Sequence, residues 1–428
     1  MTDTYKIQVT ELVFGLSSAL DLVSHSLVNH HRQVFGFAVK IAEAFSLCEE
    51  QQRDVGIAAL LHDIGVVAFD YCSAEPQFSD AAYNEHAELG YRLIREFPPF
   101  LAAADVVRHH HASWRGWDDG LSIGDYGARL GGSIVSLADR VAQKIDPGGC
   151  VLTQSDDIRS WITDDCRGLF MPEVVEAFLQ ESEKEYFWLD SRFASFTQLG
   201  VRSALSDANL LLDLPGLQEL SALFGKIIDY RSRHTAAHSR SVARLCEALG
   251  RLAGLSASDC SRLHVAGNLH DLGKLALPPS ILDKPGGLDA TERKAVKSHP
   301  YHTYRILKDI EGLGEIPAWA SFHHEYGDGS GYPFRLTDAE IPFGAKIVAV
   351  ADNLAALTEH RPYRSGLPRD ACLGLMQGRA QDKKLDSELV WLAGRHYDEL
   401  YDLTVTAQRE ALQEYDAILQ RSLPVSRA

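Results

Sequence analysis

The histidines and aspartates of this chain recur at a fixed spacing, and this repeat is the feature that most limits the folds open to it. The stretch HHRQVFGFAVKIAEAF, which begins at His30, aligns with HSRSVARLCEALGRLA, which begins at His238, at an offset of 208 residues. The same offset pairs LLHDIG, which contains His62, with NLHDLGK, which contains His270. Further along, the offset becomes 213, and it pairs His86 with His299, His110 and His111 with His323 and His324, and Asp139 with Asp352. A constant offset on either side of a single change in length indicates duplication of one unit.

We therefore predict two copies of one unit of roughly 200 residues, a common domain size. The first copy spans residues 1–204 and the second spans residues 205–428. The stretch LSDANLLLDLPG at 205–216 contains turn formers and a proline, as expected of a linker.

Each copy has the pattern of helices rather than strands. Val242, Leu245, Leu249 and Leu252 follow one another at spacings of three and four, which predicts one apolar face of a helix. IGDYGARLGGSIVSLADRVAQ and IPFGAKIVAVADNLAALTEH have the composition of apolar helices, and strand-like alternation is scarce. The predicted fold is all-α, with two tandem helical bundles that arise from an internal duplication.

Charge and cysteine content narrow the function. The formal net charge is -17, which argues against broad binding to DNA, RNA or an anionic membrane. A small anionic substrate remains compatible if metal ions or local cations supply positive charge. The seven cysteines are dispersed without a C-x-x-C pair, which indicates reduced thiols in a cytoplasmic protein. We expect neither a signal peptide nor a membrane-spanning helix.

Seven residues of the second copy are candidate metal ligands, and five of them are histidines. They are His238, His270, Asp271, His299, His323, His324 and Asp352. Histidine and carboxylate donors without cysteine suit ions such as iron, manganese, zinc or cobalt. Seven ligands are too many for one tetrahedral site. They suit two ions roughly 3.5–4 Å apart that clamp the oxygens of a phosphoryl transfer, with Asp271 as the natural bridge between them.

Four motifs in the second copy resemble the HD-GYP domain, a branch of the HD metal-dependent phosphohydrolases. They are HDLGK at 270–274, PPSILDKPGGLDATERKAVKSHP at 278–300, HHEYGDGSGYP at 323–333 and ADNLAALTEHRPYR at 351–364. The resemblance implies a phosphodiesterase that hydrolyses a cyclic dinucleotide, chiefly cyclic di-GMP, to a linear dinucleotide and onward to GMP. It also implies two divalent ions, usually iron or manganese. Some members bind a third ion through a glutamate where this chain has His234; we expect two ions and leave the third open.

The resemblance also suggests which residues act on the substrate. It places Asp271 and Lys274 in the catalytic centre, and Lys274 lies one helical turn after His270 if the helix continues that far. The predicted substrate contacts are Gly331, Tyr332, Arg361 and Arg364, with Asp328 and Lys346 as further candidates. Glycine allows close approach of the backbone, and arginine carries a fork of donors suited to phosphate and guanine.

The first copy retains the seven ligand types but has lost the other groups. Its candidate metal site comprises His30, His62, Asp63, His86, His110, His111 and Asp139. Val66 stands where the second copy has Lys274, and Ala112 stands where it has Glu325. We therefore expect a degenerate copy with a regulatory or dimerising role, which retains the donors for a second metal site.

Several alternatives remain open at this point. The substrate could be 3′,3′-cyclic GMP-AMP, or the chain could be a non-catalytic sensor of cyclic dinucleotides that acts through a protein partner. A hydrolase of another nucleotide is a third hypothesis, which the GYP motif disfavours. A homodimer and a signalling partner such as a diguanylate cyclase are also compatible with the sequence.

Overall fold

The computed structural model describes residues 6–22, 29–68, 80–116, 123–164, 166, 168–192, 210–231, 237–284, 286–359 and 366–420. Helices dominate these residues, and the all-α prediction is confirmed. The described strands are β1 (Ile7–Gln8) and β2 (Leu211–Leu212), which pair antiparallel. None of the described helices combines the length and the apolar character that a membrane span requires. Three predicted site residues lie outside the described residues: His234, Arg361 and Arg364.

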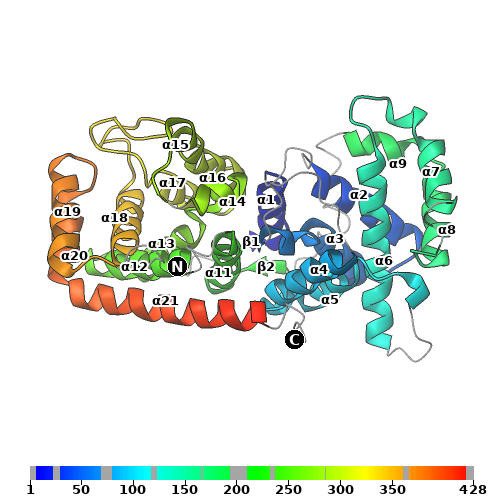
Figure 1. Ribbon diagram of the computed structural model, residues 1–428, viewed down its shortest axis with the longest axis horizontal. Coiled ribbons are helices and arrows are strands. Elements are labelled where there is room, and N and C mark those ends of the chain that lie inside the picture. The colour runs from blue at the N-terminus through cyan, green and yellow to red at the C-terminus, as the bar shows by residue number, and fades with distance from the viewer. Residues whose placement is uncertain are drawn as a thin grey trace. The chain divides into compact units, whose positions relative to one another are not determined.

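The chain folds into two compact units (Figure 1). The N-terminal unit contains α2 (His30–Ala44), α3 (Glu49–Leu61), α4 (Asp80–Ile94), α5 (Leu101–His109), α6 (Ile123–Lys144), α7 (Ser155–Asp164), α8 (Pro172–Glu181) and α9 (Glu185–Leu189). The C-terminal unit contains α1 (Val9–Asp21), α11 (Leu214–Tyr230), α12 (His238–Leu252), α13 (Ala257–Leu269), α14 (Pro279–Leu282), α15 (Ala290–Val296), α16 (His299–Leu307), α17 (Ile316–Ser321), α18 (Phe343–Thr358), α19 (Arg369–Gln381), α20 (Ser387–Arg395) and α21 (Tyr397–Gln420). Short 3-10 helices follow α3 and α13, namely η2 (Ile64–Ala68) and η8 (Leu272–Ala276).

The helices repeat at the offset that the histidines predict. The bounds of α2 and α12 differ by 208 residues at both ends, and so do those of α3 and α13 and of η2 and η8. The predicted apolar face of α12 is buried at Val242, Leu245 and Leu249, and Leu252 is half-buried. Because both helix ends and core positions repeat, the two copies share one local architecture.

The long helix α21 packs against α11 and α12 of the C-terminal bundle. It packs along α12, as the red helix of Figure 1 shows. The Arg240 guanidinium donates to both carboxylate oxygens of Glu414, at 3.0 and 2.6 Å. The rings of Tyr230 and Tyr415 stack with centroids 4.8 Å apart. A single ion pair at a surface contributes little to the free energy of unfolding. The ion pair and the ring stack together set the position of α11 and α12.

The predicted linker contains the start of a helix. Residues 205–209 lie outside the described part of the chain, and α11 begins at Leu214. Pro215 occupies the first turn of α11, where the missing N–H group would have had no helical partner. Asp213 caps the helix by accepting a hydrogen bond from the Gly216 N–H at 3.0 Å. The turn formers of this stretch therefore mark a helix start as well as a boundary.

Helix α1 does not follow the predicted division into 1–204 and 205–428, because it belongs to the C-terminal unit. It packs on α16 and η8. Gly15 is buried against Ile306 and Ile310, and Glu11 accepts a hydrogen bond from the Glu311 N–H at 2.9 Å. The repeat pairs α1 with α11 in sequence, but it carries no information on which surface an apolar helix covers.

Replacing Gly15 with leucine should destabilise the C-terminal unit. A Cβ atom at Gly15 would already lie 3.1 Å from Ile310 Cδ1, so a larger side chain overpacks the contact. Overpacking costs about 1–3 kcal/mol, which is roughly 2–4 °C in melting temperature per kcal/mol for a unit of this size. Gly374→Leu is the matched control, since a Cβ there meets nothing within 4 Å. Equal melting curves for both variants would refute the packing of α1.

Candidate metal centre

The seven predicted ligands of the C-terminal unit meet in one buried cluster, although they come from separate segments. His238 begins α12, His270 and Asp271 follow α13, His299 begins α16, His323 and His324 follow α17, and Asp352 lies within α18. His238 Nε2 lies 3.2 Å from an oxygen of Asp352. His270 Nε2 and His299 Nε2 each lie 3.3 Å from an oxygen of Asp271. The fold therefore brings these ligand atoms together.

Asp271 lies between two groups of donors. One group is formed by His238, His270 and Asp352, and the other by His299, His323 and His324. Within each group the donor atoms lie within 4.8 Å of one another. Oδ2 of Asp271 faces His270, whereas Oδ1 faces His299. One carboxylate oxygen on each side is the arrangement needed to bridge two cations.

The histidine rings are oriented by carbonyl groups at helix ends. His270 Nδ1 donates to Gly267 O at 2.8 Å, at the end of α13. His299 Nδ1 and His323 Nδ1 donate to the carbonyls of Val296 and Ala320, both at 2.7 Å, at the ends of α15 and α17. The last carbonyls of a helix lack an intrahelical partner, so they are free to accept these bonds. Since a carbonyl only accepts, each Nδ1 carries the proton and each Nε2 presents its lone pair to the cluster.

Burial and nearby charge set the protonation of the cluster. Burial lowers the pKa of His299 to about 3 and that of His323 to about 4, so both rings are neutral near pH 7. Burial would raise the pKa of Asp271, but His270 and Lys274 hold it well below its ordinary value. Burial would lower the pKa of His238, but the hydrogen bond with Asp352 and the charge of Glu359 raise it to about 9.

The donor set fits divalent metal ions. His270 Nε2 is buried without a hydrogen-bond partner among the described residues, and such an atom costs about 1–3 kcal/mol. Neutral imidazole nitrogens and ionised carboxylates without a thiolate are the donors that borderline divalent ions prefer, and an ion bound at His238 would displace the proton that this ring holds at pH 7. Two ions would be held by the two donor groups and joined by Asp271.

Lys274 reaches the cluster by a different local structure from the one expected. Helix α13 ends at Leu269, and Lys274 lies in the 3-10 helix η8. Its ammonium donates to Asp271 Oδ2, three residues earlier in the chain. Gly273 packs directly against the backbone of His299 and leaves no space for a Cβ atom. The condition of a continued α-helix is not met, and this close packing accompanies a tighter turn, but the Lys274 ammonium still reaches Asp271.

The GYP motif forms a loop that Glu325 holds in place. Glu325 is buried, and its two oxygens accept hydrogen bonds from the N–H groups of Phe334 at 2.6 Å and Leu336 at 2.9 Å. Gly331 packs so closely on the backbone of Glu325 that a side chain cannot fit there. The Tyr332 N–H donates to the carbonyl of the preceding ligand, His324, at 3.1 Å, and the two rings lie 4.9 Å apart. The loop is therefore attached directly to a metal-ligating segment.

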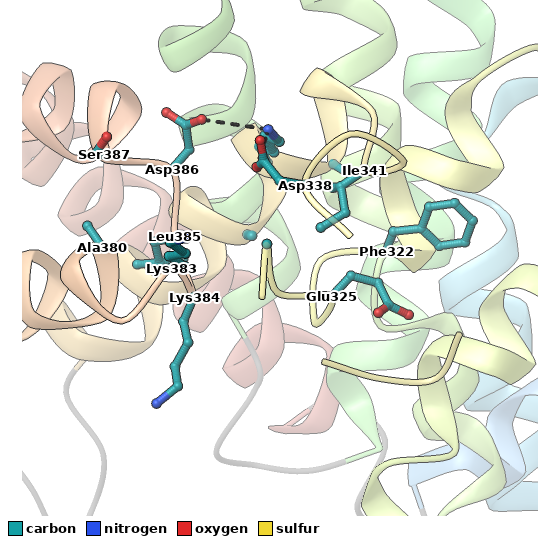
Figure 2. A pocket seen from close by; sticks show the side chains of 14 residues that line it. Phe322, Glu325, Asp338, Ile341, Ala380, Lys383, Lys384, Leu385, Asp386 and Ser387 are labelled. Carbon is teal, nitrogen blue, oxygen red and sulfur yellow. Dashed lines mark hydrogen bonds and ion pairs between the residues drawn. The ribbon is translucent and has the colours of Figure 1, made fainter. Parts of the chain in front are cut away.

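The two further candidates, Asp328 and Lys346, make other contacts. Asp328 accepts hydrogen bonds from the N–H and hydroxyl groups of Ser330 and so stabilises its own turn. Lys346 lies six residues before Asp352 on α18, which is about 240° around a helix. It lines a cavity of about 300 Å³, where it donates to Asp338 at 2.6 Å and lies 3.9 Å from Asp386 (Figure 2). Their roles as substrate contacts stay predictions.

Sequence reasoning missed two acidic groups beside His238. Asp229 is buried and accepts hydrogen bonds from the N–H and hydroxyl groups of Ser239, at 3.0 and 2.8 Å, which fixes the start of α12. Burial raises the pKa of Asp229 to about 8, although His238 opposes the shift. Glu359 lies 3.7 Å from His238 Nδ1. Asp229 recurs as Asp21 in the repeat, a usable signal, whereas Glu359 follows the end of a helix without any pattern.

The N-terminal unit contains the same cluster. His30 Nε2 lies 3.1 Å from Asp139, against 3.2 Å for the corresponding pair in the C-terminal unit. Asp63 lies 3.3 Å from His62 Nε2 and 3.5 Å from His86 Nε2, so it too faces two donor groups. Asp63 itself belongs to the first group, with His30 and His62, and the second group is His86, His110 and His111. The duplication has preserved the geometry of the ligands.

The fold and the two clusters define a class of protein. Residues 27–146 and residues 222–389 each match the HD domain family. The chain belongs to this family and carries two HD domains in tandem, which confirms the resemblance seen in its motifs.

The chain is also similar to individual proteins with known names. Over 94% of its length and 94% of the relative, the chain is 28% identical to 3'3'-cGAMP-specific phosphodiesterase 1 of Vibrio cholerae. Over 36% of its length and 42% of the relative, it is 38% identical to a cyclic di-GMP phosphodiesterase of Thermotoga maritima. The crystal structure of the cyclic GMP-AMP specific phosphodiesterase V-cGAP3 of V. cholerae has a TM-score of 0.63, with 23% identity, and the match covers 92% of this chain and 98% of that one. This last likeness shows that the fold extends over both units.

Asp271→Ala should lower the metal content of the C-terminal unit and abolish its catalysis. Two cations at close range need the shared carboxylate that offsets their charge. Elemental analysis should show the loss of at least about one ion per chain, as expected when a bridging ligand is removed. Asp309→Ala is the control, since that side chain is 72% exposed. A full metal load with normal turnover would contradict the bridging role.

Glu325→Gln should loosen the GYP loop while the metal content stays normal. The NH2 group of the glutamine side chain cannot accept a hydrogen bond, whereas its carbonyl oxygen can. The N–H of either Phe334 or Leu336 therefore loses its acceptor, at a cost of about 1–3 kcal/mol. Hydrogen exchange of the peptide that contains both N–H groups should accelerate. The exposed Glu315→Gln is the control. Unchanged exchange in both variants would show that Glu325 does not anchor the loop.

Proposed function

We propose that the C-terminal unit is a metal-dependent phosphodiesterase that hydrolyses a cyclic dinucleotide. The observation that carries the proposal is the pair of donor groups that share Asp271, beside a lysine and a loop anchored to His324. This arrangement provides donors for two cations, with the Lys274 ammonium and the GYP loop beside them. The names of the relatives support the class of substrate.

The residues of the chain divide the work as follows. The donor groups would hold two ions, which we propose to be iron or manganese. When bound, such ions polarise phosphate oxygens and make a water molecule a stronger nucleophile. Lys274, held by Asp271, adds positive charge at the same place, and Gly331, packed on the backbone of Glu325, remains a predicted substrate contact together with Tyr332. The side chains of Arg361 and Arg364 remain predicted contacts to phosphate or guanine.

Two cyclic dinucleotides compete as the substrate. The resemblance to the HD-GYP domain implies chiefly cyclic di-GMP, and the Thermotoga relative, which aligns with part of the chain, is a cyclic di-GMP phosphodiesterase by name. The Vibrio relative that aligns over 94% of the chain is specific for 3'3'-cGAMP by name. Because this second alignment includes both units, we propose 3′,3′-cyclic GMP-AMP as a candidate substrate of equal standing with cyclic di-GMP. Linear dinucleotide is the first product expected from either, and GMP is a further product.

The deciding experiment is incubation of metal-reconstituted protein with each cyclic dinucleotide, followed by chromatography of the products. The control is the His270→Ala variant treated in the same way. Hydrolysis by the wild-type protein alone supports the enzyme. Tight binding of either compound without hydrolysis, under conditions of full metal load, would favour the alternative of a non-catalytic sensor that acts through a partner.

We infer that the N-terminal unit binds metal without being the main catalytic site. Its cluster repeats the geometry of the other, and His62 Nε2 is buried without a hydrogen-bond partner among the described residues. Val66 replaces the lysine, and Ala112 replaces the glutamate that anchors the GYP loop. A metal there would connect separate helices, and such binding energy contributes to folding. A regulatory or dimerising role and a cytoplasmic location remain predictions.

Two double variants should separate these roles. His62→Ala with Asp63→Ala should lower the melting temperature or alter oligomerisation more than it alters the rate per site. His270→Ala with Asp271→Ala should abolish activity. Steady-state kinetics, metal analysis and melting curves on both proteins provide the comparison. If the first variant stays folded, keeps metal in the C-terminal unit and loses all activity, the proposed division is wrong.

A further inference from the structure

The rim of the C-terminal metal centre holds a cation that is not among the predicted substrate contacts. Lys297 is the C-cap residue of α15, and it precedes the ligand His299 by two positions. Its side chain is exposed, and its ammonium lies 5.0 Å from the centroid of the Tyr332 ring. This distance is within the range of a cation–π interaction. The lysine therefore connects the segment that begins α16 to the GYP loop.

The ring beneath Lys297 is held in a fixed position. Tyr332 is bound through its N–H group to the carbonyl of His324, and its ring is tilted by 30° against the His324 ring. Gly331, the preceding residue, has no space for a side chain. The Tyr332 ring therefore lies between the Lys297 ammonium, 5.0 Å from its centroid, and the ring of the candidate ligand His324, 4.9 Å from it.

The charge of Lys297 is available to a ligand. Within the described parts of the chain, its ammonium forms no ion pair with a carboxylate. Lys274, in contrast, is engaged by Asp271. The offset of 213 residues pairs Lys297 with Asn84 in the N-terminal unit, so this cation is another group that the first copy lacks.

A cyclic dinucleotide carries two phosphodiester groups, each with one negative charge, and the ions compensate only the one that is cleaved. We propose that Lys297, supported by the Tyr332 ring, binds the phosphate that is not cleaved. The proposal rests on the proposed function and extends it, since it makes Lys297 a residue that selects substrates with a second phosphate. An ammonium suits this role because it is a compact charge with three donors.

The test compares two phosphodiesters that differ in the number of phosphates. One is the cyclic dinucleotide that the wild-type protein cleaves, and the other is bis(p-nitrophenyl) phosphate, which has a single phosphate. Lys297→Met keeps an apolar stem over Tyr332 but removes the charge, and Lys297→Arg keeps the charge. Elemental analysis of each variant reports whether the metal content has changed.

In Lys297→Met, the ratio of KM for the cyclic dinucleotide to KM for bis(p-nitrophenyl) phosphate should rise about tenfold or more, as expected for a lost hydrogen bond to a charged group. Lys297→Arg should restore most of the ratio, and metal content should be constant. An equal loss of activity on both substrates would overturn the proposal, because Lys297 would then only support the loop. An unchanged ratio with unchanged rates would overturn it as well.

Failure of the proposed function is distinguishable from failure of this inference. If the wild-type protein cleaves bis(p-nitrophenyl) phosphate but neither cyclic dinucleotide, the proposed function is refuted before any variant is compared, and the inference about Lys297 is refuted with it.

Discussion

The hydrogen bond between a histidine ring and a carbonyl at the end of a helix is the interaction on which both clusters of candidate ligands depend. In His62, His110, His270, His299 and His323 the Nδ1 atom donates to the carbonyl three residues earlier. Each bond engages a carbonyl near the end of a helix and fixes the ring tautomer at the same time, and the Val107 carbonyl also accepts from the His110 N–H. In the N-terminal unit the ends of α3 and α5 must therefore converge on one cluster. In the C-terminal unit the ends of α13, α15 and α17 must converge on the other, and this requirement sets the arrangement of each bundle.

The convergence of the histidine rings requires a buried carboxylate among them, which is Asp271 in the C-terminal unit. Imidazole nitrogens that face one another at 3.4 Å, as in His299 and His323, are stable only with a proton or a cation between them. Asp271 offers one oxygen to each donor group and is nearly inaccessible to solvent, so its charge must be compensated within the cluster. Lys274 provides part of that compensation, and the two proposed divalent ions would provide the rest. The same reasoning applies to Asp63, except that Val66 provides none.

The sequence predicted the helical fold, and it predicted which histidines and aspartates lie together, because both leave periodic signals. Apolar spacing locates α12 and α18, and the repeat of His and Asp locates both clusters. It failed where geometry depends on contacts between segments. The surface that α1 covers is decided by Gly15 against α16, and the 3-10 turn at Lys274 accompanies the packing of Gly273 on His299. Glu325 was visible in its motif, but its role as a loop anchor depends on N–H groups nine and eleven residues away, which no spacing rule identifies.

Comparison of the two units separates the clusters of candidate metal ligands from the groups that we propose for substrate recognition. Both retain the donor atoms at nearly equal distances, so the ligands and the helix ends that orient them are sufficient for a cluster. Only the C-terminal unit adds Lys274, Lys297 and the glutamate that anchors the GYP loop. All three groups lie beside the cluster, and the two lysines bring positive charge into a chain with a formal net charge of -17. Such charge is useful where an anion must approach buried carboxylates, and it is dispensable where a metal only connects helices. The differences between the copies are therefore those expected if one unit receives a phosphodiester and the other does not.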